Sequence, residues 1–450
     1  MQAAAFRHRL YCRPDGGYGG ADEHTGAGMG ARIPAVGVQR DTTGGGWLPR
    51  WCVVVPWFAA LALAVLWFPL VGTTDVVDRL MWMNDIADRG VRDAFRTSYA
   101  QYPPLSFVLL AAPTGFARAF ALDPLVAYKA SLAVALALTG VVCAWWTRRG
   151  LAAGLLTLAL TPGTMALGYN DVYYLPPLLL ALWAGERRRF GMFIALLAAA
   201  ALVKWQPLAL APPLLLYIAF ALRGENAGRL PQSGRFARAM LPGALICAAV
   251  LLVFGMETVH ALLRAGADPY LSGNAPNANW LLGLLLRAWQ PDVYAANPLP
   301  YQQYVVVTDR SLLLLPKAVC AAAYGWVLFR FWHGGRTYGD ALFAALLGYL
   351  AYWLFNTGVH ENHLIPAVVF AAALWAREGR LWWLFAALAL LLNLNLWLFY
   401  GFDGGNHVPP AAVTAPLALV VVAAGVALLT YESRSRPAFA SPLHPVPHET

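Results

Sequence analysis

Residues 410–431 read PAAVTAPLALVVVAAGVALLTY, a run of 22 residues without a charged side chain. A helix needs about 20 consecutive apolar residues to cross the hydrocarbon core of a bilayer, so this run is long enough for one crossing. Arg434 and Arg436 follow it closely, and basic residues are enriched beside the cytoplasmic ends of spanning helices. The run therefore predicts a transmembrane helix.

The composition of the whole chain agrees with this interpretation. Of 450 residues, 59% are hydrophobic and 12% are charged, and the mean hydropathy is +0.54. Soluble domains carry about twice that share of charged residues. In a membrane chain, the formal net charge of +9 bears on orientation rather than on nucleic-acid binding. The sequence predicts an all-α polytopic membrane protein with the lipid bilayer, and no nucleic acid, as a partner.

The number of spanning segments decides the predicted topology. Thirteen apolar segments are candidates: residues 51–70, 103–118, 124–147, 151–168, 171–186, 190–203, 207–222, 239–256, 311–330, 340–358, 361–376, 381–402 and 410–431. If residues 103–118 instead form a short, proline-led juxtamembrane helix, every arginine cluster falls on the side of the N-terminal tail, as the positive-inside rule requires. The sequence thus predicts 12 transmembrane helices, with juxtamembrane helices in the first extracytoplasmic loop.

Three regions are expected along the chain. Residues 1–46 are polar and rich in glycine and contain no apolar segment typical of a signal peptide. We expect a disordered cytoplasmic tail there, with Met29 as an alternative start, followed by a transmembrane domain at 47–432. A second disordered cytoplasmic tail is expected at 433–450.

The predicted cytoplasmic turns are short and rich in arginine, whereas the other side carries varied polar motifs. No GxxxxGK[ST] pattern occurs, and no GxGxxG pattern stands between a strand and a helix. The five cysteines have no spacing typical of a disulfide framework or a metal site. We therefore expect any chemistry on the extracytoplasmic side, without a nucleotide.

The first external loop contains a predicted helix with several charges on one face. Asp75, Asp78 and Trp82 are spaced to share that face, and Gly90 would end the helix. Asp75 and Arg79 are four residues apart, as in a helical ion pair. These charges could simply keep an interfacial helix out of lipid. Asp75 is the first carboxylate after the first predicted span, which favours a functional role for this residue.

Further polar groups interrupt the apolar segments on the same side. Lys204 lies between two apolar runs, where it is either a lysine that extends its amine to the interface or a cation for an anionic ligand. In the 270–280 loop, asparagines are either turn residues or partners of sugar hydroxyls, with Trp280 as a stacking surface. His360 and His363 are three residues apart at a turn, unlike the i,i+4 pair of zinc enzymes. A divalent cation is therefore a minor alternative.

Taken in order, these motifs resemble those of the GT-C superfamily of membrane glycosyltransferases, in particular the bacterial branch related to GPI mannosyltransferases. The resemblance covers about residues 50–400. It rests on six motifs: Asp75, Tyr102-Pro103-Pro104, Gly168–Asp171, Lys204–Gln206, Ser272–Trp280 and His360–His363. Gln101 stands where the family often has Asp, and Asn362 stands where it often has Arg.

The resemblance implies a mannosyltransferase-like enzyme that transfers a hexose, mannose or glucose, from a polyprenyl-phosphate donor. The acceptor would be a glycan, lipid or protein outside the cytoplasmic membrane. Asp75 is implied as the catalytic base, with Asp78 as the alternative. The side chains expected at the donor phosphate and lipid are Tyr102, Lys204, His360 and His363. Those expected to bind the sugar or acceptor are Asn170, Asp171, Gln206, Asn274, Asn277, Trp280 and Glu361.

A second hypothesis belongs to another functional class. The chain could be a membrane transporter, or a flippase of a lipid-linked sugar. Transporters are often built from internal repeats with a site at the bilayer midplane. No convincing repeat relates the halves of this sequence, and its polar motifs gather on one predicted face, which favours the enzyme. A catalytically inactive assembly partner is a third alternative.

Overall fold

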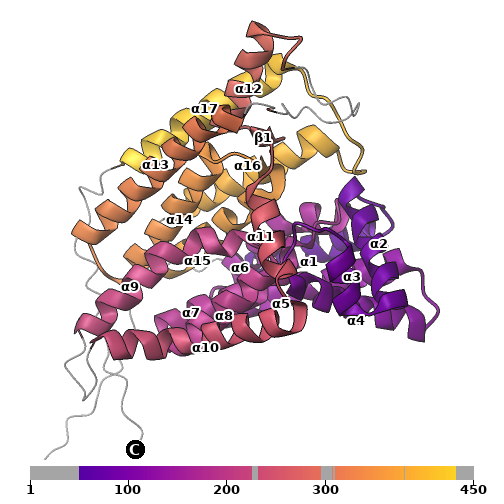
Figure 1. The fold of residues 1–450 in the computed structure, drawn as a ribbon, viewed down its shortest axis with the longest axis horizontal. Helices are drawn as coiled ribbons and strands as arrows, with labels where there is room; N and C mark the ends of the chain where they lie inside the picture. The colour runs from indigo at the N-terminus through magenta and orange to yellow at the C-terminus, as the bar shows by residue number, and fades with distance from the viewer. Residues whose placement is uncertain (1–49, 225–231, 295–306, 308–309, 380, 432–450) are drawn as a thin grey trace, which may run out of the picture. The chain divides into compact units, whose positions relative to one another are not determined.

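The computed structural model describes residues 50–224, 232–294, 307, 310–379 and 381–431. These residues form 17 α-helices and one pair of short strands (Figure 1). The first nine helices are α1 (Arg50–Trp67), α2 (Thr74–Arg89), α3 (Val91–Thr97), α4 (Pro104–Ala119), α5 (Pro124–Thr147), α6 (Gly150–Thr161), α7 (Leu175–Glu186), α8 (Phe190–Val203) and α9 (Ala211–Gly224). The others are α10 (Gln232–Phe254), α11 (Glu257–Gly266), α12 (Ala278–Trp289), α13 (Leu314–His333), α14 (Tyr338–Phe355), α15 (Ile365–Glu378), α16 (Trp382–Tyr400) and α17 (Ala411–Thr430).

The helices have the lengths and composition of a membrane protein. In the described part of the chain, seven are long and apolar enough to cross a bilayer: Pro124–Thr147, Gln206–Arg223, Ser233–Phe254, Ser311–His333, Tyr338–Phe355, Trp382–Tyr400 and Ala411–Thr430. Three shorter apolar helices cover Trp51–Trp67, Gly150–Ala166 and Phe190–Val203. An all-α membrane-embedded fold is thus confirmed, whereas 12 spans remain a prediction. The predicted tails at 1–46 and 433–450 lie outside the described residues.

Burial separates inner helices from outer ones. α14 is largely buried, with α9, α13 and α15 packed around it. α10 and α17 expose large apolar side chains, among them Leu252 at 84% and Val420 at 65%. A helix that is apolar on all sides suits a bilayer rather than water, because its outer face then meets hydrocarbon.

The predicted proline-led helix after Tyr102 is confirmed as α4. Pro104 occupies its first position, where a missing N–H costs nothing, and the helix runs for 16 residues. α4 packs against α2 and α5. It therefore supports α2, the helix that carries Asp75, Asp78 and Arg79. Its location in the membrane interface remains a prediction.

Short irregular segments separate several apolar helices. η1 (Pro162–Ala166) is a π-helical turn, and η2 (Asn170–Tyr174), η3 (Gln206–Leu210) and η5 (Glu361–Leu364) are 3₁₀ turns. Each 3₁₀ turn precedes a helix that has proline at its start or within its first turn. These breaks place polar residues at helix ends instead of within the apolar surface.

Two strands join distant parts of the chain. β1 (Ser272–Gly273) pairs in parallel with β2 (Val359–His360), and Gly273 lies opposite His360. A Cβ on Gly273 would lie 2.5 Å from His360 Nδ1, so the close approach requires glycine. The pairing holds the loop before α12 against the turn that follows α14.

Candidate functional site

A polar cavity of about 880 Å³ lies where these irregular segments meet. Its lining comes from α2, the loop before α4, the turn after α8, α11, the loop that contains β1, the start of α13, the end of α14, η5 and the end of α16. The sequence-predicted residues in the lining are Asp75, Asp78, Tyr102, Lys204, Gln206, Asn274, His360, Glu361 and His363. Five of the six motifs therefore contribute directly to one cavity.

α2 supplies the acidic side of the cavity. The Asp75 side chain is 43% exposed, and its Oδ2 lies 3.6 Å from Nη2 of the buried Arg79. The Arg79 guanidinium lies over the rings of Trp82 and Tyr102, 4.2 Å from each centroid. Burial opposes the charge of Arg79, but Tyr102 and Asp75 more than offset this and raise its pKa. Arg79 is thus a fixed cation beside an accessible carboxylate.

Lys204 and Asp171 form a buried ion pair. Lys204 Nζ lies 2.7 Å from Asp171 Oδ1, and the two side chains are 7% and 1% exposed. Asn362 Nδ2 donates to Asp171 Oδ2 at 2.9 Å. Burial opposes the charge of Lys204, but Asp171 and then Tyr102 raise its pKa above the usual value. Lys204 is therefore charged and oriented, and Asp171, predicted to bind sugar or acceptor, is its partner.

Glu361 lies in a second hydrogen-bonded group. Its Oε1 accepts hydrogen bonds from the hydroxyls of Tyr169 at 2.6 Å and Tyr400 at 3.1 Å. Asn274 Nδ2 donates to the Tyr400 hydroxyl at 3.2 Å. Burial raises the pKa of Glu361, although His360 and the Tyr169 hydrogen bond act in the opposite direction. The group joins two predicted ligand residues, Asn274 and Glu361, from segments far apart in the sequence.

The two histidines of the turn have different environments. His363 Nδ1 accepts a hydrogen bond from the His360 backbone N–H at 3.3 Å, and the two rings lie 5.3 Å apart. Burial, with His360 and Lys204 nearby, holds the pKa of His363 well below its usual value. His363 is therefore neutral at pH 7. The place of His363 at a donor phosphate stays a prediction, and a neutral ring there would meet the phosphate without adding positive charge.

This pKa shift predicts a pH-dependent stability. The unfolded chain binds a proton on His363 near pH 6.5, whereas the folded chain resists it. The His363 contribution to stability should therefore fall as the pH drops below 6.5, by up to about 1.4 kcal/mol per pH unit until the lower folded pKa is reached, while the raised pKa values of Glu361 and Asp268 act in the opposite direction. Thermal unfolding in detergent between pH 7.5 and 5 measures this loss, and His363→Gln should flatten its slope. The exposed His333 provides the control: an equal flattening by His333→Gln would contradict the assignment.

A carboxylate that sequence reasoning missed lies beside Gln101. Gln101 Nε2 donates to Asp268 Oδ1 at 2.7 Å, and both residues line the cavity. Burial raises the pKa of Asp268, while His360, Gln101 and Lys317 act to lower it. The chain thus has a carboxylate next to Gln101, the position at which the superfamily that this sequence resembles often has Asp. In the sequence, the presence of Gln at position 101 was the only indication that this position is unusual. It did not indicate that Asp268, 167 residues away, lies beside it.

Four predicted ligand residues do not reach the cavity lining, and one of them is Asp171, the buried partner of Lys204. Asn170 is buried in η2. Asn277 caps α12 by accepting from the Trp280 N–H, and its Nδ2 donates to the Trp353 carbonyl. Trp280 is 4% exposed and meets the Phe399 ring edge to face. Asn277 thus caps a helix and Trp280 packs in the core, and their contact with a sugar stays a prediction.

The polar groups of the cavity lining include carboxylates, fixed cations and amides. In the described part of the chain, no group of three or more His, Cys, Asp or Glu residues is arranged to hold a metal ion. Asp75 is accessible to a proton from a bound hydroxyl, while Arg79 and Lys204 supply positive charge within the same lining. This arrangement suits a displacement in which a base accepts a proton and cations stabilise an anionic leaving group.

Comparison with models of protein families finds no match for this chain, and comparison with curated proteins finds none either.

Proposed function

We propose that the protein is a GT-C-type membrane hexosyltransferase. It transfers a hexose, mannose or glucose, from a polyprenyl-phosphate donor to an extracytoplasmic glycan, lipid or protein acceptor. The observation that carries the proposal is the convergence of five motifs, separated by up to about 285 residues, on one polar cavity. The order of these motifs in the sequence resembles that of the superfamily, which supplies the donor class.

The proposed reaction is a direct displacement at the anomeric carbon. The acceptor hydroxyl oxygen forms a bond to this carbon as the bond from the carbon to the phosphate oxygen breaks. Asp75 accepts the hydroxyl proton, and the polyprenyl phosphate leaves with the bonding electron pair. Arg79 and Lys204 supply the positive field around the leaving phosphate, and configuration at the anomeric carbon is inverted.

The proposed location is the cytoplasmic membrane, with the cavity on the periplasmic or exterior face. The positions of the arginine clusters support this orientation, because short loops rich in Lys and Arg remain in the cytoplasm. A donor presented on that face requires no nucleotide-binding site in this chain. Tyr102, whose ring lies 5.4 Å from Lys204 Nζ, would then contact the donor near its phosphate.

The test uses the full-length protein in liposomes with polyprenyl-phosphate mannose or glucose and membrane extract as the acceptor source. We expect sugar transfer with release of polyprenyl phosphate, and none from nucleotide sugars. Loss of the same sugar from the surface glycans or lipids of a deletion strain would agree. Movement of intact donor lipid across the bilayer without release of polyprenyl phosphate would instead support the flippase.

A further inference from the structure

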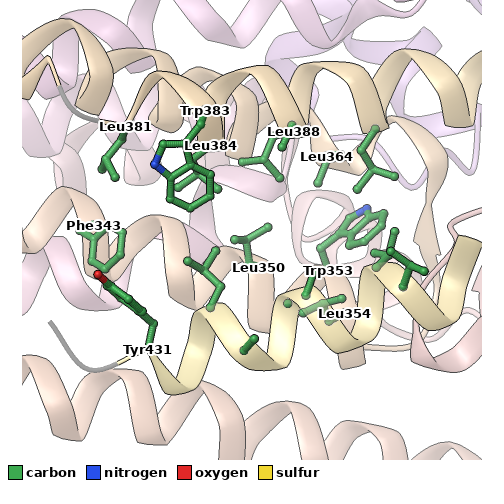
Figure 2. Close-up of a pocket in the computed structure, with 18 of the residues that line it drawn as sticks. Phe343, Leu350, Trp353, Leu354, Leu364, Leu381, Trp383, Leu384, Leu388 and Tyr431 are labelled. Atoms are coloured by element: carbon green, nitrogen blue, oxygen red, sulfur yellow. The ribbon is translucent and has the colours of Figure 1, made fainter.

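A second cavity, of about 780 Å³, lies between α16 and α17 and is floored by α14 (Figure 2). Small side chains leave this space open, among them Ala387 on α16 and Ala424 on α17, while large apolar side chains such as Leu350 and Trp353 line its floor. Val420 on its rim is 65% exposed and Trp383 is 50% exposed. In a membrane-embedded protein, such an open apolar groove faces hydrocarbon rather than water.

The groove has one polar end. Tyr431, which follows α17, lies at the same end as Leu381 (Figure 2). Glu378, which ends α15 three residues before Leu381, also lines the groove. At the same end, Arg330 donates to the carbonyls of Leu429 and Tyr431, each at 2.9 Å. The opposite end is lined by apolar residues, including Leu364. A ligand with an apolar chain and a charged head would therefore place its head at the Tyr431 end.

The groove is shorter than the membrane is thick. Its lining extends from Gly339 to Leu354 on α14, from Leu381 to Leu391 on α16 and from Val420 to Tyr431 on α17. At 1.5 Å per residue, these stretches measure about 15–23 Å. The hydrocarbon core is about 30 Å thick, so the groove crosses about half to three-quarters of it. This length suits one acyl chain better than a long isoprenoid chain.

The groove is separate from the polar cavity. On α14, Tyr352 and Asn356 line the polar cavity, whereas Trp353 and Leu354 line the groove. The polar cavity lies at the C-terminal end of α14, while the polar end of the groove is near Gly339 at the N-terminal end. A donor with its phosphate in the polar cavity would thus not present that phosphate to the polar end of the groove.

We infer that this groove is a binding site for one acyl chain of a bilayer phospholipid from the leaflet opposite the polar cavity. The phosphate lies towards Arg330, and the chain end rests against Leu364, the residue after His363. Binding is driven by burial of the chain against apolar side chains. Arg330, beside the polar end, attracts the phosphate, whereas the Glu378 carboxylate in the lining favours a headgroup that also carries an ammonium. This inference does not depend on the proposed transferase activity.

The first experiment measures phospholipid retained by the full-length protein in mild detergent, by native mass spectrometry. We expect a bound phospholipid in the wild type and its loss in Ala387→Phe and Ala424→Phe, which fill the groove. Ala386→Phe and Ala423→Phe are matched controls, because both residues are exposed neighbours that do not line it. Equal retention by the lining and control variants would overturn the proposal, as would the mass of an isoprenoid in place of a phospholipid.

A second experiment needs no substitution, so it remains decisive if the lining variants do not fold. A phospholipid with a photoreactive group in its acyl chain is added to wild-type protein in liposomes, and adducts are mapped by peptide mass spectrometry. Adducts should concentrate in 381–391 and 420–431 and should persist with excess polyprenyl phosphate. Adducts spread evenly over the outer helices, or displaced by polyprenyl phosphate, would overturn the assignment. Sugar transfer, measured separately, distinguishes failure here from failure of the proposed function.

Discussion

Asp75→Asn should abolish most sugar transfer while leaving a folded, membrane-inserted protein. Loss of a general base lowers a rate by about 10²–10⁴-fold. The structural cost should be small, because Asp75 is 43% exposed and its contact with Arg79 is 3.6 Å long; an accessible ion pair contributes under about 1 kcal/mol. Arg79 keeps its contacts with the two aromatic rings. The reaction rate per folded molecule, with donor binding measured separately, is the quantity to compare.

Two other carboxylates of the lining serve as matched controls. Asp78→Asn and Asp268→Asn each remove one negative charge from the same cavity, so a general electrostatic effect would lower the rate similarly in all three variants. A loss confined to Asp75→Asn supports its role as the base. Near-normal transfer by Asp75→Asn with an inactive Asp78→Asn or Asp268→Asn would move the role to that residue.

The second large effect is expected at the buried Lys204–Asp171 pair. Asp171→Leu leaves the ammonium of Lys204 buried without its carboxylate, which typically costs about 3–5 kcal/mol. Lys204→Met takes the cation away from Asp171, which keeps the Asn362 hydrogen bond, and should cost a similar amount. Such a loss is large beside a total stability of about 5–15 kcal/mol. Chemical unfolding in detergent and the yield of folded protein measure it.

The double variant separates this pairing from a simple packing defect. Lys204→Met with Asp171→Leu removes both charges, so it should be much more stable than the sum of the single losses predicts. Additive losses would contradict a coupled ion pair. The double variant also tests the role of Lys204 in the reaction separately from its role in stability. If this cation stabilises the leaving phosphate, a folded double variant should still lose sugar transfer.

The apolar helices were predictable because hydrocarbon-facing segments are long and uniformly apolar. The proline-led α4 was predictable because Pro103 and Pro104 restrict the backbone before it. The exact bounds of the membrane-spanning helices were not predictable, because hydropathy cannot resolve turns that contain apolar residues. The segment 171–186 appears continuous in sequence, yet the structure divides it into η2 and a 12-residue helix, α7.

The candidate site was predictable as a set of residues but not as a set of contacts. Polar residues that interrupt apolar runs stand out locally, as Lys204 and His360 do. Their partners do not: Asp171 could have capped its own helix, and nothing in the sequence joins Gln101 to Asp268. Trp280 could equally have faced a sugar or the core, and the sequence does not indicate that its ring packs against Phe399.

One helix, α14, forms a wall of both the polar cavity and the apolar groove. Tyr352 and Trp353 are neighbours in the chain but face different compartments. A rigid helix cannot shift one face without shifting the other, so a ligand that moves α14 from the groove changes the energy of binding in the cavity. Thermodynamic linkage makes this coupling reciprocal: whatever the lipid does to substrate affinity, the substrate does to lipid affinity by the same factor. With the proposed activity and the inferred lipid site together, the composition of the surrounding bilayer would be a variable of the reaction.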